Sequence, residues 1–372
     1  MKKKFLVCFF MVFFMVFSVF ADFNYKLDFL SLDPIYSEYL ANRGRSGLSL
    51  SNLFFSEGFP NTIIQDTYFN EDHTEQEVYV FNFDEEIEPN DRMVNLQVGE
   101  TFGLFRNTFT FDSWLSPISF DFSMQGVLSF FFRGKFDDNI GYDGMYFYGI
   151  TGSIGDFISF RFGNHHYCSH YGDAILKRIQ TYNFGQNDGN FWLTYKYVRM
   201  QTRMFSISIE PCSWFRIYGE VDYPPRGIYS IRPDMFAPNW IKRDGLYINP
   251  EYPDSYNARI VATGIELTFT LFKNLGKTAI GYDLRFYEEG KVTYDHDEGG
   301  EFTFDEEAPW EMEHNIKIAQ NLSRTISIEL AYHKGRSPYN NNFYQQCQYV
   351  AVGLRFNPDN TVTLFNTEKT KK

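Results

Sequence analysis

The stretch ISFDFSM at residues 118–124 alternates apolar and polar side chains without interruption. Ile118, Phe120 and Phe122 take one set of positions, and Ser119 and Asp121 take the other. Successive side chains of a β-strand point to opposite faces, so this pattern predicts a strand with one apolar and one polar face. The same alternation returns at residues 157–163, 205–210, 215–222, 265–271, 280–286, 326–333 and 349–356. The chain is therefore predicted to be all-β.

The composition fits strands that separate lipid from a polar interior. Aromatic residues make up 20% of the 372 residues, yet the mean hydropathy is -0.35. A membrane barrel produces this combination because each strand turns one face to lipid and the other to a polar lumen. The formal net charge of -13 argues against nucleic acid as a partner, since nucleic-acid binding needs a basic surface.

The first 21 residues have the composition of a cleaved signal peptide. Three lysines at positions 2–4 precede an apolar run at residues 5–17, and Ala21 offers a small residue at the cleavage point. No other stretch approaches the ~20 consecutive apolar residues of a membrane helix. We therefore expect export to the outer membrane of a diderm bacterium. Cys168, Cys212 and Cys347 remain after cleavage, as one disulfide with a free thiol or as three thiols.

Short and long connections alternate between the predicted strands. Short ones fall at residues 114–117, 153–156, 211–213, 273–276 and 321–323, and long ones at 133–144, 164–190, 224–257, 288–311 and 334–346. This alternation is typical of an up-and-down transmembrane β-barrel of antiparallel strands, with short periplasmic turns and long extracellular loops. A soluble periplasmic β-protein is the other architecture that shows one apolar and one polar face per strand.

The scheme gives eleven strands between residues 101 and 356, and a closed bacterial barrel has an even number. One more strand is expected before residue 101, with residues 77–83 as the best candidate and 94–99 as the second, which makes about 12 strands. The chain thus divides into the signal peptide at 1–21, an irregular acidic segment at 22–92, the barrel at 93–356 and a polar tail at 357–372. The acidic segment is expected either outside the barrel or inside its lumen.

The polar face of almost every predicted strand carries charge. The lumen of a barrel with about 12 strands is wide enough to need filling, and charges of both signs can form an ion-pair lattice there. The predicted lumen charges are Arg161, Arg216, Glu220, Asp222, Glu266, Asp283, Arg285, Glu329 and Arg355.

The densest group of reactive side chains is GNHHYCSHYGD at residues 163–173. This segment resembles the hallmark His-x-Ser-Ser-His-x-Gly-Asp of a bacterial exported family catalogued as domain of unknown function 1207, which it matches at His166, Ser169, His170, Gly172 and Asp173. Cys168 stands where the family pattern has its first Ser, and Ala174 where an acid is common. The resemblance extends to segments 32–34, 216–219 and 335–338. It implies a similar outer-membrane barrel and no assigned activity.

Three interpretations of this motif cluster are open, and the preferred one is structural. In that interpretation the His, Ser and Asp side chains hold the backbone of a loop, and Asp173 caps a short helix at 174–178. The second follows from outer-membrane phospholipases, which place His and Ser two residues apart on one barrel face. If the strand continues, His166, Cys168 and His170 share the lipid side, with His166 as base and Cys168 or Ser169 as nucleophile. The third is a metal site made of His165, His166, His170 and Asp173, although their spacing is not that of the common zinc sites.

The sequence therefore favours a non-enzymatic outer-membrane β-barrel, either a narrow pore or a structural and interaction protein. The alternatives are an outer-membrane lipid hydrolase and a soluble periplasmic β-protein. No cofactor and no metal are expected. The expected partners are outer-membrane lipid, lipopolysaccharide and the barrel-assembly machinery. An acidic loop at residues 295–307 is expected to be a solvated charge run, with Ca²⁺ bridging to lipopolysaccharide phosphates as the alternative.

Overall fold

The computed structural model describes residues 23–58, 62–69, 75–82, 92–133, 138–172, 197–223, 232–233, 241–243, 246–248, 259–287, 291–295, 301–305, 310–323, 325–339, 346–356 and 363–366. The signal peptide predicted at residues 1–21 lies outside these ranges, as do Asp173 and most of the acidic loop.

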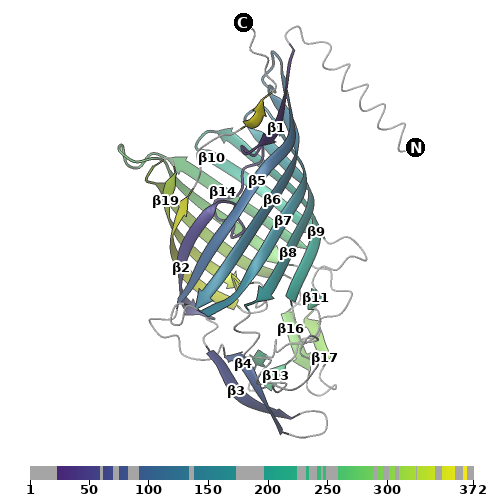
Figure 1. Cartoon of the computed structure of the whole chain (residues 1–372), viewed down its shortest axis with the longest axis vertical. Coiled ribbons are helices and arrows are strands. Elements are labelled where there is room, and N and C mark those ends of the chain that lie inside the picture. The colour runs from purple at the N-terminus through teal and green to yellow at the C-terminus, as the bar shows by residue number, and fades with distance from the viewer. Residues whose placement is uncertain are drawn as a thin grey trace, which may run out of the picture.

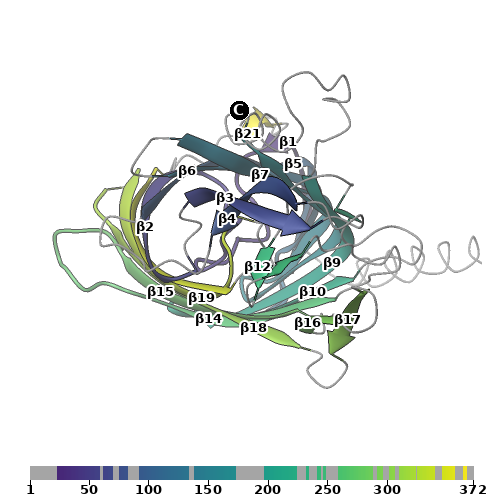
Figure 2. The same ribbon diagram turned by 90° about the horizontal axis from the view of Figure 1, so that it is seen from below.

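Twelve antiparallel strands form a closed barrel (Figure 1). Around the ring the strands follow chain order, and β2 closes the ring by pairing with both β5 and β20 (Figure 2). The twelve are β2 Leu48–Glu57, β5 Arg92–Thr110, β6 Ile118–Arg133, β7 Asp138–Ile154, β8 Ile158–Tyr171, β9 Tyr197–Cys212, β10 Phe215–Tyr223, β14 Ile260–Phe269, β15 Thr278–Tyr287, β18 Glu311–Asn321, β19 Ile326–Arg336 and β20 Gln346–Phe356. The structure confirms the predicted fold class.

The two ends of the barrel differ in their connections (Figure 1). One end has short turns, such as residues 155–157 between β7 and β8 and 213–214 between β9 and β10. Small hairpins lie at the other end: β3 (Thr62–Phe69) with β4 (Glu75–Asn82), β12 (Ile241–Arg243) with β13 (Leu246–Ile248), and β16 (Lys291–Asp295) with β17 (Glu301–Asp305). The short β11 (Arg232–Pro233) extends the pairing of β9. Within the described ranges, no helix has the length and apolarity to cross a membrane.

The first barrel strand lies earlier in the chain than the sequence analysis predicted. Residues 75–82 are a strand, but β4 pairs with β3 in a two-stranded sheet of its own, so the prediction of residues 77–83 as a barrel strand was wrong. Residues 94–99 belong to β5. The twelfth strand is β2, inside the segment 22–92, and the barrel therefore begins before residue 93. Its alternation is of the same kind as elsewhere, with Leu48 and Leu50 exposed and Ser49 buried.

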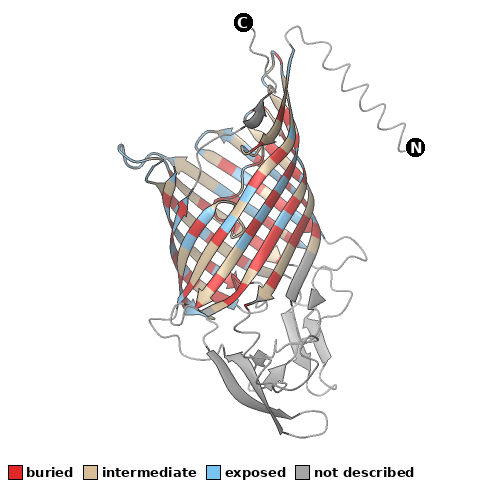
Figure 3. Cartoon of the chain, viewed as in Figure 1, coloured by how far each residue is buried: buried red, intermediate tan, exposed pale blue. Residues whose placement is uncertain are grey.

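Side chains alternate between the outside and the lumen along each strand, as the burial colours show (Figure 3). On β20, Val352 and Leu354 are 45% and 42% exposed on the outer face, whereas Ala351 and Arg355 are buried. The barrel thus presents apolar side chains outward and polar side chains inward. This arrangement is typical of a barrel surrounded by lipid and is the opposite of a soluble β-protein, which buries its apolar face.

The segment at residues 32–47, which we call the plug, lies inside the barrel. It connects β1 (Asn24–Ser31), which pairs with β5 and with β21 (Thr363–Asn366), to β2. Arg216 of β10 donates to the Ser37 carbonyl at 2.5 Å, and Arg355 of β20 donates to the Ser46 carbonyl at 2.7 Å. These strands lie apart in the ring, so the plug crosses the lumen between them. This part of the N-terminal segment therefore lies in the lumen and not outside the barrel.

Candidate functional site

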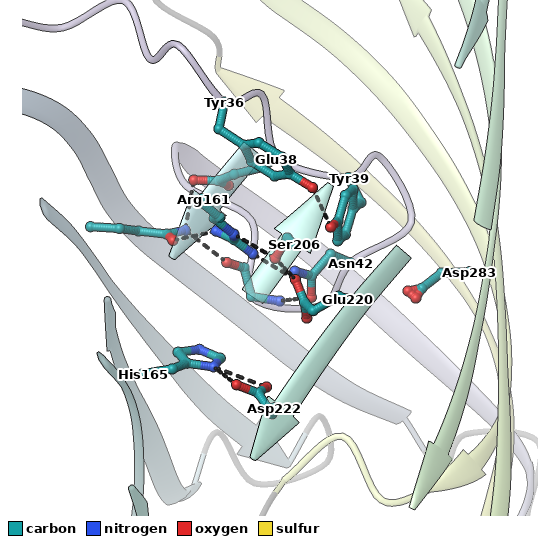
Figure 4. A network of polar contacts seen from close by, with 12 residues as sticks. Tyr36, Glu38, Tyr39, Asn42, Arg161, His165, Ser206, Glu220, Asp222 and Asp283 are labelled. Atoms are coloured by element: carbon teal, nitrogen blue, oxygen red, sulfur yellow. Dashed lines mark hydrogen bonds and ion pairs between the residues drawn. The ribbon is translucent and has the colours of Figure 1, made fainter. Parts of the chain in front are cut away.

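Stacked aromatic rings fix the first half of the plug against the wall. Tyr39 is fully buried and stacks on Tyr218 of β10, with ring centroids 3.5 Å apart and planes 7° apart. Gly264, on the neighbouring strand, makes room for this stack, because a Cβ at that position would lie 2.3 Å from the Tyr218 hydroxyl oxygen. The Tyr36 hydroxyl makes a short hydrogen bond with the Tyr39 hydroxyl (Figure 4). Burial raises the pKa of Tyr36, which lies outside the strands, to about 12, so this pair is neutral at physiological pH.

A carboxylate of the plug collects hydrogen bonds from the opposite side of the wall. Glu38 accepts from the Thr101 hydroxyl at 2.7 Å and from the Gln125 amide at 2.6 Å. Ser46, at the far end of the plug, donates to the same oxygen at 2.6 Å. Glu38 therefore ties the plug to β5 and β6 and also ties its two ends together.

Two arginines attach the second half of the plug to β18 and β19. Arg43 pairs with Glu313 of β18 at 3.0 Å and donates to the Ser337 carbonyl at 2.8 Å. Arg45 pairs with Glu329 of β19 at 3.3 Å. Buried ion pairs of this kind require close geometry, because removing one partner leaves an uncompensated charge. The plug is thus held by charge as well as by ring stacking.

The nine predicted lumen charges all lie on the inner face and most of them meet an opposite charge. Glu220 pairs with Arg161 at 2.8 Å (Figure 4) and with Arg285 at 3.8 Å. The further pairs are Arg285 with Asp283 at 3.3 Å, Arg216 with Glu266 at 3.1 Å and Arg355 with Glu329 at 2.8 Å. Asp222 pairs with His165 at 3.1 Å and accepts from Thr202 at 2.8 Å. The structure brings these side chains together across neighbouring strands.

Sequence reasoning missed several lumen residues that contact this lattice. Glu313 and Lys317 lie on β18, and Lys317 joins Glu329 at 3.4 Å. The alternating connections implied a strand between residues 311 and 321, and the alternation of EMEHNIKIAQN agrees with it, but the inward charges of this strand were not predicted. The plug residues had no such signal, because an irregular segment has no period.

The motif cluster is part of a strand, not of a loop. β8 continues to Tyr171 and pairs with β7 as far as Gly141, so the prediction of a loop from residue 164 was wrong. The ladder therefore supplies hydrogen-bond partners for the backbone N–H and C=O groups of this segment, so the side chains of the motif are not needed to hold the backbone. Gly172 ends the strand, with its amide donating to the Ile140 carbonyl at 2.9 Å. The predicted cap Asp173 and its helix at 174–178 lie outside the described residues.

The strand alternation separates the motif residues onto two faces. His165 and Ser169 face the lumen, and Ser169 is fully buried. His166, Cys168 and His170 follow the outward parity of Phe162. Within the described residues no group of three metal-binding side chains gathers. Of the alternative metal set, His165 lies on the lumen side of the wall, and His166 and His170 lie on the other side.

The outward side chains stack on tyrosines of the neighbouring strand. His166 stacks on Tyr146 with centroids 4.5 Å apart, and His170 stacks on Tyr142 at 4.9 Å. Cys168 lies over Gly144, where an added Cβ would be 2.8 Å from the sulfur. Glycines here leave a hollow of about 900 Å³ on the outer face, lined among others by Glu100, Gly126, Gly144, Tyr146 and Cys168. Cys168, Cys212 and Cys347 are all free cysteines, which selects the three-thiol alternative.

The chain was compared with known families, curated proteins and solved structures. No family model matches it, and no curated protein matches it. Among solved structures it resembles the NanC porin, with 10% identity, a TM-score of 0.36, and coverage of 83% of this chain and 99% of that one. It also resembles outer membrane phospholipase A from Escherichia coli, with 8% identity, a TM-score of 0.43, and coverage of 84% and 97%. A third is the COG4313 outer membrane channel from Pseudomonas putida F1, with 9% identity, a TM-score of 0.34, and coverage of 87% and 98%. These similarities concern the barrel fold alone.

Proposed function

We propose that this chain is an outer-membrane β-barrel whose lumen is closed at rest by its own plug, and that its role is structural or interaction-based and non-enzymatic. The observation that carries the proposal is the set of contacts between the plug and several parts of the wall: Tyr39 on Tyr218, Glu38 with Thr101 and Gln125, and Arg43 with Glu313. A standing diffusion pore needs an open, water-filled lumen. Here aromatic rings and ion pairs occupy that space.

We also propose that the barrel is inserted in the outer membrane. The apolar outer face supports it, together with the signal peptide expected at residues 1–21. The partners we propose are outer-membrane lipid, lipopolysaccharide and the barrel-assembly machinery. We also propose membership of the family with domain of unknown function 1207. Of the segments that carry this resemblance, 32–34 lies in the plug, and 216–219 and 335–338 contact it: Arg216 donates to the Ser37 carbonyl, and the Ser337 carbonyl accepts from Arg43.

Conductance across a planar bilayer tests the closed lumen. The wild-type chain is expected to show no steady ion current, because the plug fills the path. A variant with residues 34–45 replaced by a Gly/Ser linker of equal length is expected to conduct steadily. The matched control is Phe162→Ala on the outer face, where Phe162 is 52% exposed, and it should stay silent. A steady wild-type current equal to that of the linker variant would rule out the closed state.

A lipid hydrolase is the second candidate, favoured by one observation. Cys168 lines the outer-face hollow together with Glu100 and Tyr146, and His166, on the same strand, stacks on Tyr146. Ser169, the other nucleophile considered, is buried on the lumen side and is removed from this candidate site. We expect no phospholipid or acyl-ester turnover by the wild type in mixed micelles. Turnover that is present in the wild type and lost in both Cys168→Ala and His166→Asn would establish the hydrolase instead.

A further inference from the structure

A chamber remains in the lumen between the plug and the wall. It has a volume of about 180 Å³ and is bordered by plug residues 41–44. On the wall it reaches Ile260, the first residue of β14, and Tyr287, the last residue of β15. These strand ends belong to the rim that carries the hairpins (Figure 1). The chamber therefore reaches the hairpin rim, and it also extends along the wall to Arg355, near the other end of β20.

The charges that border the chamber are mostly positive. Five cations border it, namely Arg43, Arg285, Lys317, Arg336 and Arg355, and the carboxylates that border it are Asp143 and Glu329. Their other counter-charges lie behind them: Glu313 and Asp283 are fully buried and do not border the chamber. More cationic hydrogen-bond donors than carboxylate acceptors therefore border the chamber.

One of these donors has unused hydrogen-bonding capacity. Arg285 is only 5% exposed, and its Nη2 has no hydrogen-bond partner among the described residues. Its Nε lies 3.3 Å from Asp283 and its Nη1 lies 3.8 Å from Glu220, so the ion pairs engage the other nitrogens. A guanidinium offers five N–H donors in a planar fork that matches a carboxylate. A buried donor of this kind favours an anionic acceptor.

Apolar side chains form one part of the chamber surface, beside polar ones such as Asn95, Gln97 and Ser129, and the volume limits the ligand in size. Leu53, Phe131 and Ala351 border it and belong to a buried hydrophobic cluster that includes Tyr349. A cavity of ~150 Å³ holds a molecule of the size of benzene. The chamber, at about 180 Å³, fits a compact molecule of that class with one charged group added.

We propose that this chamber binds a small organic carboxylate with an apolar body, with the carboxylate on Arg285 and the body against Phe131 and its neighbours. The inference does not depend on whether the barrel conducts, because the plug and the wall form the chamber together. It also does not involve the outer-face residues His166 and Cys168.

Calorimetry on the detergent-purified full-length chain tests the proposal with three aromatic probes of similar size and different charge. Benzoate is expected to bind with a Kd below about 1 mM, in line with the affinity of small ligands per heavy atom. Benzyl alcohol should bind about ten-fold or more weakly, and benzylammonium should not bind, because only the anion gains the charge-assisted bonds. Equal binding of benzoate and benzyl alcohol, or no benzoate binding by the wild type, would overturn the proposal.

Two variants locate the binding. Arg285→Gln should weaken benzoate binding about ten-fold or more, whereas the control Arg203→Gln, which removes an equal charge from the exposed outer face, should leave it unchanged. Ala351→Leu fills the chamber without touching a charge and should also abolish binding. If Arg285→Gln does not fold, as judged by gel mobility before and after heating, the benzoate affinity of Ala351→Leu tests the chamber assignment. Wild-type affinity in a folded Arg285→Gln or in Ala351→Leu would refute the assignment.

Discussion

The type of side chain that a strand position requires depends on whether the position faces the lumen or the outside of the barrel. Leu330 is 46% exposed on the outer face of β19, and its neighbour Glu329 is buried in the lumen between Arg355 and Lys317. The two residues are adjacent in sequence, but one is surrounded by hydrocarbon in our proposal and the other by charge. The physical requirement at each position is therefore opposite, although the backbone conformation is the same.

Leu330→Arg should destabilise the barrel by ~2–4 kcal/mol, the cost of an arginine near the bilayer midplane on the lipid face of a barrel. Folding titrations in phospholipid vesicles, with the fraction folded read from gel mobility, measure this difference. Leu330→Phe is the matched control and should fold like the wild type, since it remains apolar. If the two variants were equally stable, Leu330 would not face lipid.

At the scale of elements, different features of the sequence determine the wall and the plug. The wall strands follow from period-two alternation, whereas the plug is held by particular partners, above all Tyr39 on Tyr218. Aromatic stacking of this kind adds to the burial of the ring itself. An irregular segment with buried polar groups depends on each of those partners.

Tyr39→Ala should therefore release the plug while the barrel stays folded. The loss of a buried aromatic side chain costs ~3–5 kcal/mol, which here falls on the plug contacts. Limited proteolysis should show new cleavage within residues 33–47, and Tyr39→Phe, which keeps the ring, should show much less. Resistance of Tyr39→Ala equal to that of the wild type would mean that the stack does not hold the plug.

The length of β8 gives a second prediction at this scale. Residues 164–171 carry the motif cluster, and the structure places them in ladders with both β7 and β9. Their amide hydrogens should exchange as slowly as those of residues 158–163, because strand hydrogen bonds protect them. Exchange at the rate of an open loop would instead show that residues 164–171 form a loop and not a strand.

The elements that sequence could predict share one property, which is periodicity. The strands at 118–124, 326–333 and 349–356 were evident from alternation alone, and the final strand ends at Phe356 as expected. β18 was implied by the connections on either side of it, between residues 311 and 321. β2 had the same alternation but stood in a segment expected to be irregular, and it was not predicted as a strand. The inward direction of Arg161 and Glu220 followed from parity, but not their pairing, because parity fixes the face and the register fixes the neighbour.

For the whole molecule, the ring of strands explains why the plug position was not predictable. Residues 32–47 contact β5, β6, β10, β18, β19 and β20, which are distant in sequence and become neighbours of the plug only when the barrel closes. The acidic composition of the N-terminal segment was compatible with either side of the wall. The decisive information lies in the complementarity of Glu38, Arg43 and Arg45 with wall residues.

A disulfide between the plug and the wall tests this central claim most directly. A Cβ at Gly281 of β15 would lie 3.1 Å from the Leu40 Cβ, close to the ~3.5–4.5 Å span of a disulfide. In a background with Cys168, Cys212 and Cys347 replaced by Ala, Leu40→Cys with Gly281→Cys should cross-link in the folded barrel under mild oxidation. Leu40→Cys with Gly219→Cys, where no plug atom lies within 4 Å of the added Cβ, should not cross-link. Mass spectrometry of the linked peptides reports the outcome: a linked Leu40→Cys and Gly281→Cys pair is the predicted result, and its absence from a folded, heat-modifiable barrel would contradict a plug inside the lumen.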